Sequence, residues 1–77
     1  MSITASQSRA ARGLIQWSQA RLARQANVSL STVADFENKR RTPITNNLAA
    51  IRRVLEAAGV RFIGAGKSGG AGVRWKD

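Results

Sequence analysis

The chain has 77 residues and a mass of 8.3 kDa, and 13 lysines and arginines against 4 acidic residues give it a net charge of +9. It contains no histidine and no cysteine, which excludes disulfides, thiolate and imidazole metal sites, and cysteine or Ser-His-Asp nucleophiles. The positive charge predicts a polyanionic partner, with nucleic acid first and an anionic membrane surface second.

The first two predicted helices are short. The first covers about residues 4–15, with Thr4 or Ser6 as its N-cap. The second covers residues 19–25 and follows Ser18. A serine at this position predicts a cap, because its hydroxyl can accept a hydrogen bond from the first turn of the helix.

A tight turn is predicted next, at Asn27, because asparagine tolerates the left-handed conformation that often ends a helix. Ser29 then caps a third helix over residues 30–38, with Val33 and Phe36 facing inward. Two capped helices joined by such a turn have the arrangement of a helix-turn-helix.

The longest predicted helix follows a basic loop over residues 39–44, through which Pro43 prevents a helix from continuing. Thr45 is predicted to cap this fourth helix, which covers residues 46–58. Gly59 stands where a glycine commonly ends a helix.

Beyond Gly59 the pattern changes to the alternation of strands. Residues 60–63 and 73–76 predict a hairpin whose strands are joined by a glycine-rich linker, residues 64–72. One side of this hairpin carries Val60, Phe62, Val73 and Trp75. The linker contains Gly-Lys-Ser, but a phosphate-binding loop is rejected because Arg61 stands where its first glycine would be.

Residues 17–43 closely resemble the XRE/Cro/C1-type helix-turn-helix family of bacterial and phage regulators. The matching landmarks are Ser18-Gln19, Leu22-Ala23, Val28-Ser29, Val33, Phe36-Glu37-Asn38 and Pro43 after the basic loop. The resemblance extends over about residues 7–59. It implies a mainly α fold, with a lambda-repressor-like four-helix DNA-binding domain in residues 1–59 and a β-hairpin extension in residues 60–77.

The resemblance also implies that the third helix enters the major groove of double-stranded DNA. Its base-reading candidates are Leu30, Ser31, Thr32 and Asp35. Leu30 suits a thymine methyl group, and Asp35 either accepts from cytosine or orients a basic neighbour. The candidates for phosphate binding are Ser18, Gln19, Ser29, Asn38, Lys39, Arg40 and Arg41.

Two further expectations concern the architecture. Members of the family pair an arginine in the first helix with a glutamate at the end of the third, which implies a structural ion pair between Arg12 and Glu37. The family's usual fifth helix is absent from the pattern. We therefore leave two roles open for the hairpin: pairing across two subunits, or covering the end of the fourth helix within one chain.

These features predict a non-enzymatic, sequence-specific transcriptional regulator of the small controller type, without cofactor or metal. We expect a homodimer on an inverted-repeat operator, and a cytoplasmic protein at the nucleoid with no signal peptide and no membrane segment. Two alternatives stay open. One is an antitoxin or adaptor whose main partner is a protein, and the other is a nucleoid-associated protein that binds DNA without sequence preference.

Overall fold

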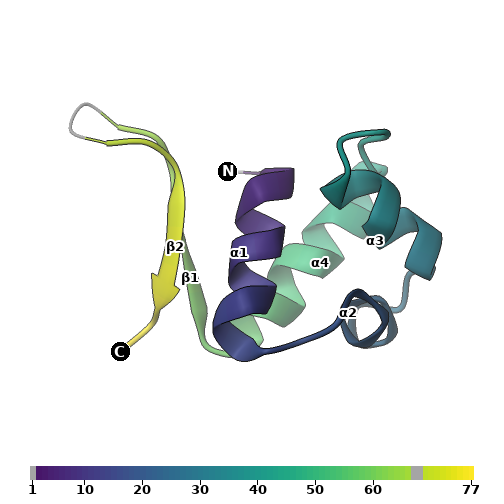
Figure 1. Ribbon diagram of the computed structural model, residues 1–77, viewed down its shortest axis with the longest axis horizontal. Coiled ribbons are helices and arrows are strands. Elements are labelled where there is room, and N and C mark those ends of the chain that lie inside the picture. The colour runs from purple at the N-terminus through teal and green to yellow at the C-terminus, as the bar shows by residue number, and fades with distance from the viewer. Residues whose placement is uncertain (1, 67–68) are drawn as a thin grey trace.

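The computed structural model describes residues 2–66 and 69–77. In these ranges four helices are followed by a two-stranded antiparallel hairpin (Figure 1). The elements are α1 (Ala5–Ile15), α2 (Gln19–Ala26), α3 (Leu30–Glu37), α4 (Thr45–Ala57), β1 (Val60–Ile63) and β2 (Gly72–Trp75). The predicted fold class, mainly helical with a C-terminal hairpin, is confirmed. Lys67 and Ser68 of the predicted linker and of the rejected phosphate-binding loop lie outside the described residues.

The first three helices begin at the predicted caps. Thr4, not Ser6, caps α1: its Oγ1 accepts a hydrogen bond from the Gln7 amide at 3.1 Å, and the Gln7 Oε1 accepts one from the Thr4 amide at 2.9 Å. Ser18 and Ser29 each accept a hydrogen bond from the backbone amide three residues on, at 3.0 and 3.1 Å. These reciprocal and single caps satisfy amides that the first turn of a helix leaves unpaired.

The start of α4 differs from the prediction. Thr45 is the first residue of the helix, so the prediction that it is the cap is wrong, and Ile44 occupies the cap position without a side-chain hydrogen bond. The reason is that Ile44, with φ of −59° and ψ of 155°, is the last residue outside the helical conformation, so the helix begins at Thr45, one residue earlier than a Thr45 cap requires. At the other end Gly59 follows the cap residue Ala58 with a φ of 108°, which favours glycine.

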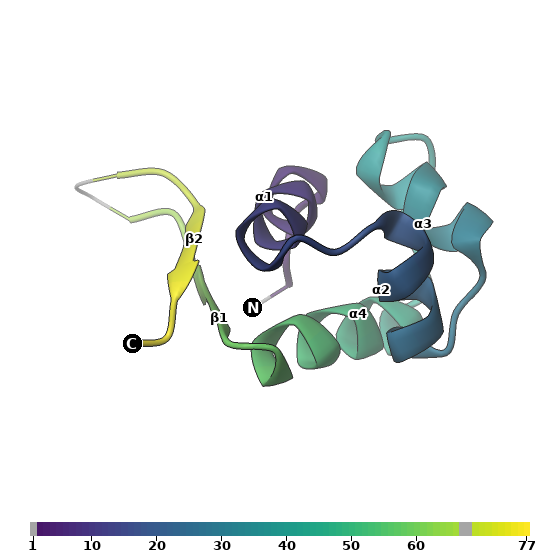
Figure 2. The same cartoon turned by 60° about the horizontal axis from the view of Figure 1, so that its bottom comes forward.

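The core lies between the four helices and the inner face of the hairpin. Its fully buried apolar members are Ala11, Leu22, Val33, Ile51, Leu55 and Val60. Figure 2 shows α4 running beneath α1 and the α2–α3 pair towards the hairpin, so that it joins the two ends of the molecule. Among the described helices none is long and apolar enough to cross a membrane.

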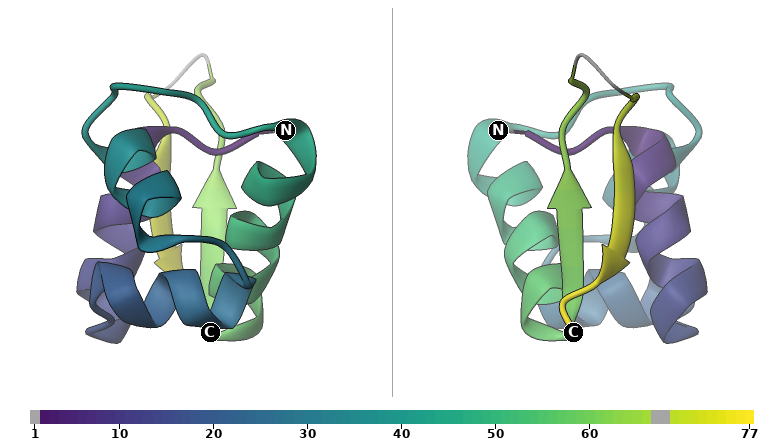
Figure 3. Two further views of the ribbon diagram at one scale, coloured as in Figure 1. Left: turned by 90° about the vertical axis from the view of Figure 1, so that its right-hand side faces the viewer. Right: turned by 90° about the vertical axis from the view of Figure 1, so that its left-hand side faces the viewer.

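The hairpin forms an outer layer against α1 and α4, with β1 on the side of α4 and β2 on the side of α1 (Figure 3). Its register pairs Val60 with Trp75 and Phe62 with Val73, so the four apolar residues lie on one face as predicted. Val60 and Phe62 are buried, whereas Trp75 is 49% exposed at the margin. A Cβ on Gly59 would lie 3.6 Å from the Trp75 ring, which places this ring over the end of α4.

Candidate nucleic-acid interface

The helix-turn-helix unit consists of α2, α3 and the turn between them. The turn is closed by Asn27, which has the left-handed φ of 57° that its sequence position predicts. Val33 and Phe36 on α3 are buried in the core, and this burial turns the opposite side of α3 to solvent. Because α3 lies at the end of the molecule farthest from the hairpin (Figure 1), its outer side is open to a large partner.

The first turn of α3 presents the base-reading candidates. Leu30 and Ser31 are exposed, and Thr32 and Asp35 are half-buried. Leu30 is 51% exposed, so a large apolar side chain is available for contact with a partner. The Ser29 hydroxyl lies 2.7 Å from that of Thr32 and 3.1 Å from that of Ser31, so three hydroxyls form one cluster at the start of the helix.

The basic loop folds back on the end of α3. The backbone carbonyl of Asp35 accepts hydrogen bonds from the amides of Arg40 and Arg41, at 2.8 and 3.3 Å. Lys39 makes this return with a left-handed φ of 61°, and its amide bonds the Phe36 carbonyl at 3.0 Å. The loop is therefore held by backbone contacts, which leave the side chains of Lys39, Arg40 and Arg41 exposed.

The carboxylate of Asp35 takes no part in this anchoring. Within the described residues it forms no ion pair, and the two ion pairs there involve other acids. Asp35 instead lines a hollow of about 230 Å³ beside α3, together with Ser31, Thr32, Arg41, Thr42, Pro43, Ile44 and Asn47. Both roles considered for the Asp35 carboxylate stay predictions, because the contacts with Arg40 and Arg41 are made by the backbone carbonyl.

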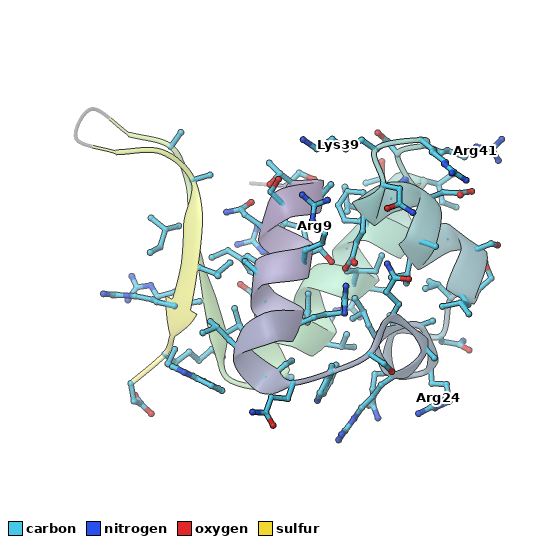
Figure 4. All side chains as sticks on the ribbon, in the orientation of Figure 1. Arg9, Arg24, Lys39 and Arg41 are labelled. Carbon is cyan, nitrogen blue, oxygen red and sulfur yellow. The ribbon has the colours of Figure 1, made fainter. Side chains whose placement is uncertain are left out.

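Cationic side chains lie on both flanks of α3. Figure 4 shows Lys39 and Arg41 reaching outward from the loop at one edge of the molecule, and Arg24 on α2 at the opposite edge. Arg24 is exposed and was not among the sequence candidates. The exposed start of α3 therefore lies between two cationic margins, as phosphate contacts on either side of a groove require.

The end of α3 is fixed by a buried carboxylate. Glu37 is 0% exposed, and Arg12 reaches it with Nη2 at 2.6 Å from Oε1 and Nε at 3.0 Å from Oε2. Ser8 donates to Oε2 at 2.6 Å and Gln19 Nε2 donates to Oε1 at 3.0 Å. Arg9 donates to the Glu37 backbone carbonyl. One residue thus ties α1, α2 and α3 together.

Burial by itself raises the pKa of Glu37, because it disfavours the charged form. The side-chain hydrogen bonds from Arg12, Gln19 and Ser8, with the charge of Arg12, outweigh burial and hold the pKa of Glu37 below its ordinary value of 4.5. The carboxylate is therefore ionised at neutral pH, as its hydrogen-bond donors require.

The position of Gln19 differs from the one expected of a phosphate ligand. Its side chain is half-buried and its amide donates inward to Glu37. The amide nitrogen carries a second hydrogen, so this contact leaves a donor for an anion. Ser18 is a cap whose hydroxyl retains its own hydrogen for donation, whereas the hydroxyl of the cap Ser29 is also hydrogen-bonded to those of Ser31 and Thr32. Asn38 is the exposed residue that ends α3.

Sequence reasoning missed Ser8, Arg9 and Arg24 as members of this site. Ser8 and Arg9 carry no local signal, since their partner Glu37 lies 29 and 28 residues along the chain. Exposed Arg24 was the one that composition could have indicated, because α2 carries two arginines and no acidic residue.

A family model described as helix-turn-helix matches residues 9–58 of the chain. No curated protein sequence matches it. The matched range runs from within α1 to the end of α4 and contains all the base and phosphate candidates. It stops before β1, so the hairpin lies outside the part that the family shares.

Proposed function

Because the chain belongs to the XRE/Cro/C1-type helix-turn-helix family of DNA-binding transcriptional regulators, we propose that it binds a specific operator as a homodimer. In this proposal it is a small controller-like regulator acting at the nucleoid, whose occupancy of the operator follows its own concentration. The observation that carries the proposal is the exposed first turn of α3, with an exposed leucine, between two cationic margins.

The proposed base contacts come from the start of α3. Leu30 offers no hydrogen bond and suits a thymine methyl group in the major groove. The hydroxyls of Ser31 and Thr32 both donate and accept, so they discriminate weakly between bases. We therefore expect few directly read bases and a larger contribution from the shape of the DNA. Asp35, at the side of the hollow, would accept from a cytosine amino group.

The proposed phosphate contacts surround α3. Lys39, Arg40 and Arg41 contact one strand from the loop, and Arg24 reaches the backbone on the other side of the groove. Ser18, Gln19, Ser29 and Asn38 add hydroxyl and amide donors at the helix ends. Arginines suit this role because the guanidinium group can bind a phosphate through two parallel hydrogen bonds.

A homodimer is proposed because one short helix seldom provides both affinity and selectivity, and two-fold related subunits read half-sites about 34 Å apart. Two roles for the hairpin remain under this proposal. Its strand edges could pair with those of a second subunit, or it could act within one chain, where Trp75 already covers the end of α4.

The test is selection of bound DNA from a random library at two salt concentrations. We expect an inverted repeat whose half-sites are about ten base pairs apart. Binding that gives no motif and disappears steeply with salt would contradict sequence-specific regulation and favour a nucleoid-associated protein. If neither condition enriches DNA, a protein partner becomes the main candidate, as in an antitoxin or adaptor.

A further inference from the structure

The outer face of the hairpin carries unpaired positive charge. Arg61 alternates along β1 with the buried Val60 and Phe62 and is exposed. Arg74 is its direct cross-strand partner, so both side chains leave the same face of the sheet. Alternation continues to Lys76, whose amide extends the ladder by bonding the Gly59 carbonyl at 2.9 Å. We call Arg61, Arg74 and Lys76 the outer basic face.

This arrangement opposes stable pairing of the two strands. Like charges directly opposite each other destabilise an antiparallel pair, where opposite charges would stabilise it. In the part of the chain that the structure describes, the ion pairs are Arg12–Glu37 and Arg52–Glu56, and neither reaches the hairpin. Asp77, the next residue after Lys76, forms no ion pair with it there. Among the described residues, the outer basic face therefore lacks an acidic partner.

The outer basic face is separated from α3 by the body of the molecule. The hairpin and α3 lie at opposite ends of its 35 Å longest dimension, with α1 and α4 between them (Figure 1). A straight duplex lying along α3 cannot also contact the outer basic face. Any DNA that binds to the outer basic face is therefore a different segment from the one that α3 contacts.

We propose that the outer basic face binds the phosphate backbone of a second DNA segment, so that one molecule holds two duplexes together. The inference rests on the proposed DNA binding by α3, which keeps the hairpin where phosphate is concentrated. A second copy of the chain stacked on this face would bring the same charges against each other. The phosphate backbone instead supplies the missing negative charge, and guanidinium groups bind it in a bidentate manner.

The experiment is a capture assay with the full chain. A selected operator duplex is fixed to beads, the protein is bound to it, and a labelled duplex of unrelated sequence is added. The variants are R61Q/R74Q, and R53Q as a control that removes an exposed arginine of α4. The melting temperature of each variant is measured, and capture is compared well below it.

We expect wild type and R53Q to capture the second duplex, and R61Q/R74Q to lose capture about tenfold or more. We also expect a weaker salt dependence for binding of the second duplex. The slope of log K against log salt concentration should become shallower by about 0.9 for every phosphate that the variant no longer binds. R61Q/R74Q should still bind the operator through α3, and it should not melt below wild type, because the substitution removes repulsion and no packing. Capture that is unchanged in R61Q/R74Q, or absent in wild type, would overturn the proposal.

The same assay separates this proposal from that of the previous subsection. R41Q, at the margin of α3, should weaken binding to the fixed operator without changing how the hairpin binds the second duplex. The opposite pattern is also possible: R41Q loses capture of the second duplex, whereas R61Q/R74Q keeps both operator binding and capture. In that case the two duplexes are held by the two α3 faces of a dimer. That result would overturn the proposal that the outer basic face binds DNA, and it would leave the proposal of operator binding by α3 unchanged.

Discussion

At the scale of single residues, Glu37 accounts for the orientation of α3. Its carboxylate is buried and receives hydrogen bonds from α1 and α2, and the Arg9 side chain bonds its backbone carbonyl. A buried carboxylate is costly unless its oxygens are paired. Here the pairing is complete, so a group that would otherwise destabilise the core fixes the end of α3 relative to both neighbouring helices.

Removing the arginine of this pair should be costly. We expect Arg12→Ala to lower the free energy of unfolding by about 3 kcal/mol, because it leaves a buried negative charge without its cation. Urea denaturation followed by circular dichroism measures the change. The control is Glu56→Gln, which breaks the half-buried i,i+4 pair Arg52–Glu56 and should cost about 0.5 kcal/mol. Equal effects of the two substitutions would contradict a structural role for Arg12.

The lowered pKa of Glu37 predicts how stability depends on pH. In the unfolded chain the group titrates near 4.5, and in the folded protein it titrates at a lower pH. Its contribution is therefore fully present above about pH 5 and is lost as pH falls through the folded pKa. Urea denaturation from acidic to neutral pH should show this acid slope in wild type and a shallower one in Glu37→Gln. Parallel slopes would contradict the assignment.

At the scale of elements, local chemistry explains what the sequence could predict. Ser18 and Ser29 cap their helices and Asn27 closes the turn because each acts on backbone within a few residues. Thr45 failed as a cap because the geometry of the chain after Pro43 decided the first residue of α4.

The contacts of Glu37 also include one that was predicted from the sequence and others that were not. Glu37 and Arg12 were predicted to pair from family resemblance. Ser8 and Arg9 were not predicted, since their contacts are formed by the fold and leave no local pattern in the sequence.

The attachment of the hairpin to α1 likewise could not be predicted from the sequence. The Gln7 side chain donates to the carbonyls of Ile63 and Gly72, both at 3.0 Å. These two residues are cross-strand partners, so one buried amide holds both strands at the same level. Its partners lie 56 and 65 residues along the chain, beyond the reach of any periodicity.

We expect Gln7→Ala to loosen the hairpin. It removes both of these hydrogen bonds and half of the capping box, which should cost about 2 kcal/mol. Hydrogen exchange should show the amides of β1 and β2 losing protection before those of α3. Gln25→Ala, at an exposed position of α2, is the control and should leave the hairpin amides unchanged. Equal protection in the two variants would show that Gln7 does not hold the hairpin.

At the scale of the whole molecule, the chain consists of a part that matches the family model and a hairpin that lies outside the match. Residues 9–58 match the helix-turn-helix family model, and the hairpin follows it. Val60 and Phe62 belong to the core, so the hairpin cannot be removed without exposing apolar surface. The role of its edges is therefore better tested in the intact chain than by truncation at Gly59.

Edge pairing of the hairpin in a homodimer predicts protection that depends on protein concentration. Hydrogen exchange is measured above and below the concentration at which sedimentation shows dissociation. Amides on the free edge of β1 or β2 should exchange more slowly in the dimer, because they then donate to a strand of the second subunit. Concentration-dependent protection confined to α4 would place the interface elsewhere and leave the hairpin as an intramolecular cover.

In the proposed function, α3 reads the DNA sequence while the cations around it hold the phosphate backbone. The most direct test is the ratio of Kd values on a selected operator and on a scrambled duplex, for wild type, Leu30→Ala and Arg41→Gln. We predict that Leu30→Ala lowers the preference for the operator about tenfold, and that Arg41→Gln weakens binding to both duplexes equally. If Leu30→Ala leaves that preference unchanged, or wild type shows none, the claim is contradicted.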